Sequence, residues 1–148
     1  MYNGLVHAHS GIRWIILAGL LFAIFNSFSG KKSGREFTDK DRKIGLIAFI
    51  GSHIQIIIGF ALYFINEHGK VSFSNMMANG FFRFFTLEHP VAMLIAITLI
   101  TVGYIKAKKG QDSKQKFSSQ FNFYLAALVI ILISIPWPFR ENLATSWF

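Results

Sequence analysis

The chain of 148 residues contains no cysteine and has few charged residues. Without cysteine it has no disulfide, no thiolate metal site, no iron–sulfur cluster and no cysteine nucleophile. Charged residues make up 15% of the chain and hydrophobic residues 53%, whereas a typical soluble domain carries about a quarter charged residues. These proportions exclude a disordered chain, a disulfide scaffold and an ordinary soluble enzyme. The sequence also lacks a glycine-rich phosphate loop and paired carboxylates within its apolar segments.

Acidic residues are scarcer than basic ones, so the formal net charge is +8. A strongly basic chain can indicate nucleic-acid binding. Here, however, the basic residues lie in short stretches between long apolar segments, a pattern typical of membrane orientation. We therefore expect a lipid bilayer as the partner and no nucleic acid.

Four apolar segments are long enough to cross a bilayer: residues 5–28, 44–65, 89–105 and 121–139. A span needs roughly 20 residues, and in lipid a helix satisfies its own backbone hydrogen bonds. The sequence therefore predicts an all-α fold, an integral membrane four-helix up-down bundle that forms one domain over residues 1–148.

Lysine and arginine are divided unevenly among the three loops. The first and third loops together hold 11 of the 15 basic residues: Lys31, Lys32, Arg35, Lys40, Arg42, Lys43, Lys106, Lys108, Lys109, Lys114 and Lys116. Because basic loops stay in the cytoplasm, we expect both termini and the second loop outside, an N-out/C-out topology. The first segment lacks a basic leader and an A-x-A site, so we expect it to be retained as a helix.

The second loop, residues 66–88, is unusually apolar. It contains Met76, Met77, Phe81, Phe82, Phe84 and Phe85. We expect a short helix in the outer membrane interface, with Lys70 and Arg83 facing headgroups. The alternative is a loop packed over the mouth of the bundle.

Four of the five histidines gather at the expected outer end: His7 and His9 in the first helix, His68 in the second loop, and His89 at the start of the third helix. Counting helical rise from the basic loops places His9 and His89 at the same level, and His53 about 10 Å deeper. The first and third helices of an up-down bundle lie diagonally opposite. His9 and His89 are therefore candidate axial ligands of one haem iron, with His7 or His53 as substitutes.

Arg13 lies one helical turn from His9, on the same face. An arginine in an apolar span needs an anionic partner or access to the interface. Haem propionates, Glu88 or Glu141 are candidates, and we favour the protein carboxylates slightly.

Each histidine also has an explanation that needs no cofactor. His89 with Pro90 suits a helix start, and His7 with His9 suits a wet N-terminal arm or a weak copper or zinc site. His53 fits a neutral core histidine bonded to a neighbouring helix. The stripe Ala48, Ser52, Gln55 and Gly59 indicates a helix–helix contact.

Four motifs carry a resemblance to a known group: His-Ala-His-Ser-Gly-Ile-Arg-Trp at 7–14, Ser-His-Ile-Gln at 52–55, Glu-His-Pro at 88–90 and Ile-Pro-Trp-Pro-Phe-Arg at 135–140. Together they resemble small four-span bacterial membrane proteins labelled cytochrome b-like, and more distantly the b561-type haem-b bundles and the half-bundles of haem A synthase. The resemblance implies the bacterial inner membrane, haem b and a role in respiratory electron transfer. Only one histidine lies deep in the membrane, which argues against two haems.

Two functional hypotheses follow. The first is a haem-b protein that passes electrons in a respiratory chain beside other membrane subunits, with a quinone as an additional candidate ligand. The second is a haem-free accessory or assembly subunit of a larger respiratory or transport complex. A histidine-lined proton or metal pathway is a third and weaker possibility. An electron carrier or complex subunit is favoured over a stand-alone enzyme.

Overall fold

The computed structural model describes residues 2–65, 71–140 and 143, and these contain helices but no strand. The helices are α1 (Tyr2–Ser33), α2 (Asp39–Ile65), α3 (Phe73–Ala78), α4 (Gly80–Arg83), the π-helical turn η2 (Phe84–Glu88), α5 (His89–Lys109) and α6 (Ser113–Ser134). The segments α4, η2 and α5 follow one another without a break. Four helices are therefore long and apolar enough to cross a membrane: α1, α2, Gly80–Lys109 and α6. Within the described ranges, the prediction of an all-helical fold with four helices long and apolar enough to span a membrane is confirmed.

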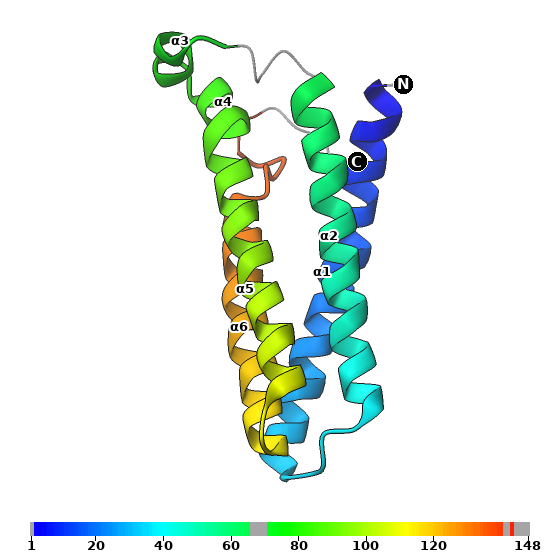
Figure 1. Ribbon diagram of the computed structural model, residues 1–148. Coiled ribbons are helices and arrows are strands. Elements are labelled where there is room, and N and C mark those ends of the chain that lie inside the picture. The colour runs from blue at the N-terminus through cyan, green and yellow to red at the C-terminus, as the bar shows by residue number, and fades with distance from the viewer. Residues whose placement is uncertain (1, 66–70, 141–142, 144–148) are drawn as a thin grey trace.

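The four long helices run alternately up and down (Figure 1). α1 packs against α2 and α6, and α5 packs against the same two helices, so α1 and α5 are diagonally opposite as expected. The connections 34–38 and 110–112 lie together at one end, which we call the basic end. α1 begins and α6 ends toward the opposite end, which we call the histidine end.

Asp41 fixes the connection between α1 and α2 at the basic end. The residue is buried, with 2% of its surface exposed. Its carboxylate accepts two hydrogen bonds from the Arg35 guanidinium, at 2.6 and 2.7 Å, and one from the Asn26 amide at 2.7 Å. The backbone N–H and the hydroxyl of Thr38 each donate to it at 2.8 Å. These bonds favour the charged guanidinium and raise the pKa of Arg35. A buried carboxylate is tolerated here because every side of it meets a donor.

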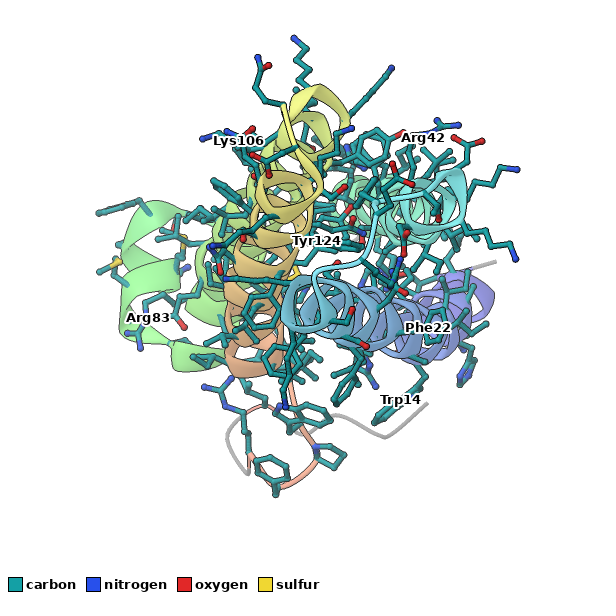
Figure 2. All side chains as sticks on the ribbon, turned by 90° about the horizontal axis from the view of Figure 1, so that it is seen from below. Trp14, Phe22, Arg42, Arg83, Lys106 and Tyr124 are labelled. Carbon is teal, nitrogen blue, oxygen red and sulfur yellow. The ribbon has the colours of Figure 1, made fainter. Side chains whose placement is uncertain are left out.

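Tyr124 links the helices in the centre of the bundle (Figure 2). It is fully buried, and its hydroxyl donates to the backbone carbonyl of Gly45 at 2.8 Å. Leu20 and Ile100 are also fully buried. By contrast, large apolar side chains are exposed along the outside of the bundle, for example Phe22 at 62%. Such an outer surface suits lipid rather than water.

The fourth helix differs from the expected segment 121–139, since it begins at Ser113 and ends at Ser134. Ile135 is extended, with ψ 134°, because the ring of Pro136 disfavours the helical conformation of the residue before it. Apolar composition therefore continues beyond the point at which the proline ends the helix.

The apolar second loop does not form the single short helix expected from the sequence. Between residues 71 and 88, the six residues of α3 form a separate helix, which Ser72 caps by accepting a hydrogen bond from the backbone of Asn75. Phe81 to Phe85 instead belong to the continuous extension of α5. Arg83 forms an ion pair with Glu88, at 2.7 Å between Nε and Oε1. Lys70 lies outside the described residues.

Candidate functional site

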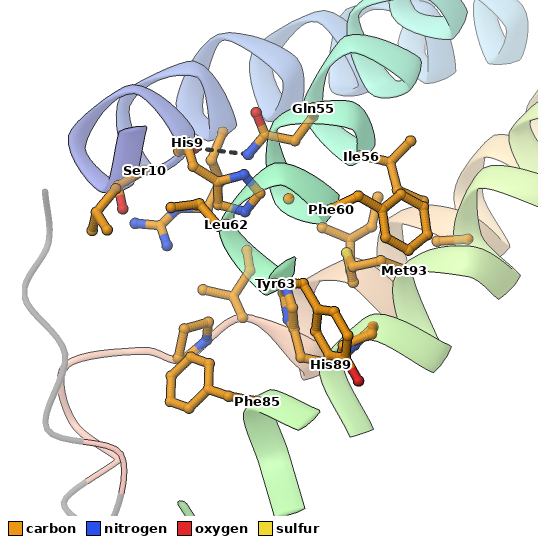
Figure 3. A pocket seen from close by; sticks show the side chains of 18 of the residues that line it. His9, Ser10, Gln55, Ile56, Phe60, Leu62, Tyr63, Phe85, His89 and Met93 are labelled. Carbon is orange, nitrogen blue, oxygen red and sulfur yellow. Dashed lines mark hydrogen bonds between the residues drawn. The ribbon is translucent and has the colours of Figure 1, made fainter. Parts of the chain in front are cut away.

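A cavity of about 460 Å³ occupies the half of the bundle toward the histidine end. Its polar lining comes mainly from α1 and α2: His9, Ser10, Arg13, Ser52 and Gln55. The apolar walls include Ile56 and Phe60 of α2 and Met93 and Ile97 of α5. His89, Tyr2 and Tyr63 add further polar groups (Figure 3). A mostly apolar cavity with a few convergent polar groups is the usual form of a small-molecule or cofactor site.

His9 and His89 face this cavity from diagonally opposite helices, with ring centroids 6.5 Å apart. The expectation that they share one level is therefore confirmed. Two bonds of about 2 Å to a shared metal ion, added to the distance from each ring nitrogen to its ring centre, would place the centroids about 6 Å apart. The ring planes differ by 75°.

The orientation of the His89 ring is set by the end of α6. Its Nδ1 donates to the backbone carbonyl of Ser134 at 2.7 Å, since a carbonyl only accepts. The proton is therefore on Nδ1, and Nε2 keeps its lone pair. Histidines that bind metals are commonly oriented in this way, through a hydrogen bond from the second ring nitrogen to a carbonyl.

The Ser134 carbonyl is free to accept this bond because of the proline spacing in Ile-Pro-Trp-Pro. In an α-helix it would accept from the backbone N–H four residues ahead, but that position is Pro138, which has none. The Leu132 carbonyl also lacks a helical donor, because the residue four positions ahead is Pro136. The indole N–H of Trp137 donates to this carbonyl instead, at 2.8 Å. The two prolines thus leave two carbonyls without backbone donors, and the side chains of His89 and Trp137 donate to them instead.

The π-helical turn before His89 has a similar cause. Pro90 cannot donate to the helix, and the backbone N–H of His89 donates to the carbonyl of Phe84, five residues back. Single π-turns of this kind occur frequently at functional sites. The Phe84 ring, with its centroid 5.8 Å from that of His89, packs beside the imidazole. Because α4 and η2 continue the helix, His89 lies within a long helix rather than at its tip.

His9 is positioned by α2. The amide nitrogen of Gln55 donates to the backbone carbonyl of His9 at 2.7 Å. A Cβ atom added at Gly59 would lie 3.3 Å from His9 Cε1, so the glycine leaves room for the ring. Within the described part of the chain, His9 Nδ1 is buried without a hydrogen-bond partner. With Ala48 and Ser52 buried, the predicted contact role of this stripe is confirmed.

Arg13 lines the cavity one turn beyond His9 and gives it a positive charge. Its guanidinium carbon also lies 5.3 Å from the centre of the Trp14 ring. Of the expected carboxylate partners, Glu88 pairs with Arg83, and Glu141 lies outside the described residues. Because Arg13 lines the cavity, an anionic group of a ligand bound there would lie near its guanidinium.

Neither His53 nor His7 lines this cavity. His53 contacts the carbonyl of Phe49 through Nδ1 at 2.8 Å and the hydroxyl of Thr101 through Nε2 at 3.4 Å. This fits the alternative of a core histidine bonded to a neighbouring helix. His7 is exposed on α1, and His68 lies outside the described residues.

The number of metal-binding side chains at the cavity indicates which kind of metal centre it could hold. Among the described residues there is no group of three or more histidine, cysteine, aspartate or glutamate side chains that would hold a bare metal ion. Two histidines make a poor cage for a bare metal ion. They are sufficient for an iron that already has four porphyrin nitrogens.

Sequence reasoning did not identify the Ser134 carbonyl or the approach of Gly59 to His9. The proline spacing at 136 and 138 was the available signal for the first of these. Comparisons of the chain with protein-family models, with curated proteins and with solved structures found no significant match.

Proposed function

We propose that this chain is a multi-pass membrane protein that binds haem b between His9 and His89 and takes part in respiratory electron transfer. The observation that supports this most strongly is the geometry of the histidine pair. The ring centroids lie 6.5 Å apart across a cavity, and the second nitrogen of His89 is bound to a carbonyl. Six-coordinate haem supplies one-electron chemistry rather than oxygen binding.

In this proposal the surrounding residues have separate tasks. Ser134 orients the His89 ring, and Gly59 makes room for the His9 ring. Arg13 meets the propionate carboxylates, because a guanidinium pairs strongly with carboxylate groups in an apolar setting. The apolar walls from α2 and α5 exclude water from the ligand.

We also propose the topology and location expected from the sequence. The basic end faces the cytoplasm of a bacterial cell, and the cavity lies toward the outer face of the inner membrane. The short helix α3, with Phe73 at 73% and Met77 at 48% exposure, lies in the outer interface. Contacts with other respiratory membrane subunits belong to the same proposal.

A reduced-minus-oxidised absorption spectrum of the purified protein tests the function. We expect a Soret band and the sharp α-band of low-spin haem b, with haem supplied during expression. A folded protein that stays colourless under these conditions would contradict haem binding. The haem-free accessory subunit would then be the better explanation, with the histidine pair serving as a polar contact between helices.

A further inference from the structure

A second, smaller pocket of about 130 Å³ lies at the basic end, far along the bundle from the histidines. The start of α2, the end of α5 and the start of α6 form it together with the connection between α1 and α2. Its lining consists of Phe37, Thr38, Asp39, Arg42, Ala107, Lys108 and Lys116. Three cations and one carboxylate thus converge on one recess.

The walls of this recess are held in place by specific contacts. The backbone N–H of Phe37 donates to the Ser113 hydroxyl at 2.9 Å, which ties the connection to α6. The ammonium of Lys116 lies 5.9 Å from the centre of the Phe37 ring. Asp39 pairs with Nε of Arg42 at 3.0 Å. Arg42 and Lys116 are both half-buried.

The charges favour an anion, because Asp39 offsets one of the three cations, its partner Arg42, and Lys108 and Lys116 leave the recess with a net positive charge. The volume suits a phosphate group better than a larger anion. The recess lies immediately beyond the apolar parts of α2 and α5. In the membrane arrangement proposed above, on which this step rests, that is the level of the lipid headgroups. Basic pockets between membrane helices on the cytoplasmic side commonly bind anionic headgroups.

We propose that this recess binds the phosphate group of an anionic phospholipid, with Arg42, Lys108 and Lys116 as its ligands. Phe37 and Ala107 provide an apolar wall for the adjoining glycerol. The inference is independent of haem binding, because no residue of the recess lines the cavity at the histidine end.

The test is native mass spectrometry of the full chain in detergent with an equimolar mixture of phosphatidylglycerol and phosphatidylcholine. We expect the wild type to retain phosphatidylglycerol selectively. The double variant Arg42→Gln/Lys116→Gln should retain at least about tenfold less, since each basic residue contributes about 1 kcal/mol to anionic lipid binding. The matched control is Lys40→Gln/Lys114→Gln, which removes the same charge from exposed positions outside the recess.

Equal retention by the two double variants would overturn the proposal, because total charge and not the recess would then determine binding. If the first double variant loses its helical circular dichroism, Lys108→Gln provides the same comparison with one charge removed, against Lys40→Gln alone. Inorganic phosphate provides the remaining arm. Displacement of the lipid by millimolar phosphate would reassign the recess to free phosphate, and retention in its presence supports the lipid.

Discussion

The imidazole of His89 and the backbone carbonyl of Ser134 are joined by a hydrogen bond of 2.7 Å between α5 and the end of α6. The carbonyl lacks a helical partner because residue 138 is proline, and the ring needs an acceptor to fix its tautomer. One bond therefore satisfies the end of one helix and orients a side chain of another. It also connects the Ile-Pro-Trp-Pro and Glu-His-Pro motifs, which are far apart in the sequence.

Replacing His89 by alanine should destabilise the protein even without a cofactor. The Ser134 carbonyl would lose its donor, at a cost of about 1–2 kcal/mol for a partly buried group. We expect a lower midpoint of thermal unfolding in detergent. The exposed His7→Ala provides the control and should leave the midpoint unchanged. Equal midpoints for His89→Ala and the wild type would show that the bond contributes nothing measurable.

The haem proposal gives a separate prediction for the histidines. His89→Ala should abolish haem binding or convert the haem to a five-coordinate, high-spin form, whereas His53→Ala should keep the low-spin spectrum. His53 is bonded to Thr101 and does not line the cavity. The measurement is the visible spectrum of each oxidised and reduced variant. Loss of low-spin haem in His53→Ala with retention in His89→Ala would contradict this assignment.

Gly59→Leu should displace the His9 ring, because even a Cβ atom at this position would lie 3.3 Å from His9 Cε1. The leucine side chain would push the His9 ring aside or enter the cavity that Gly59 lines, so overpacking should cost about 1–3 kcal/mol. We expect a lower thermal midpoint and weaker haem retention. The control is Gly19→Leu, since nothing lies within 4 Å of a Cβ at Gly19. If both variants behave alike, the effect is one of helix composition rather than of the contact with His9.

Asp41→Asn should destabilise the basic end. The neutral amide can no longer accept all the bonds from Arg35, Asn26 and Thr38, and hydrogen bonds to a charged group contribute about 2–3 kcal/mol. Asp39→Asn removes a carboxylate whose side chain is 72% exposed, and exposed ion pairs contribute little. Thermal unfolding should therefore separate the two variants clearly. Similar midpoints would mean that the buried network is not important for stability.

The topology is tested with reporter fusions at Lys109 and after Phe148. The basic bias of the first and third loops predicts that these two sites lie on opposite sides of the membrane, with Lys109 in the cytoplasm. An alkaline phosphatase fusion should be active only at the second site, and a fluorescent cytoplasmic reporter only at the first. Reporters that indicate the same side would exclude the up-down spanning arrangement.

The predictions from sequence were correct where helical rise, or the alternation of apolar segments and loops, was enough to make them. Counting 1.5 Å of rise per residue from the basic loops placed His9 and His89 at one level, and they lie beside the same cavity. Alternation of long apolar helices with short loops placed α1 and α5 on a diagonal. The small residues of α2 predicted contacts with neighbouring helices, and Gly59 does lie against His9.

Other features depended on hydrogen bonds that only the folded chain forms. The apolar run predicts a fourth helix that ends at Phe139, but Pro136 ends it at Ser134, and apolar composition does not show where a proline stops a helix. The phenylalanines before Glu88 predict a separate short helix. In the structure, the π-turn at Phe84–Glu88 joins them to the helix that contains Pro90. The apolar composition of a segment indicates whether it suits lipid. Where its helix ends depends on which backbone donors and acceptors can pair.

The sequence by itself determined four apolar helices, their alternating order and the level of the two histidines, because burial in lipid and helical rise act locally along the chain. The tertiary structure alone decided that His89 donates to Ser134, that His9 fits against Gly59 and that His53 turns instead toward Thr101. These choices depend on the rotation of each helix about its axis. That rotation is set by close packing and by hydrogen bonds between helices, which no single segment specifies.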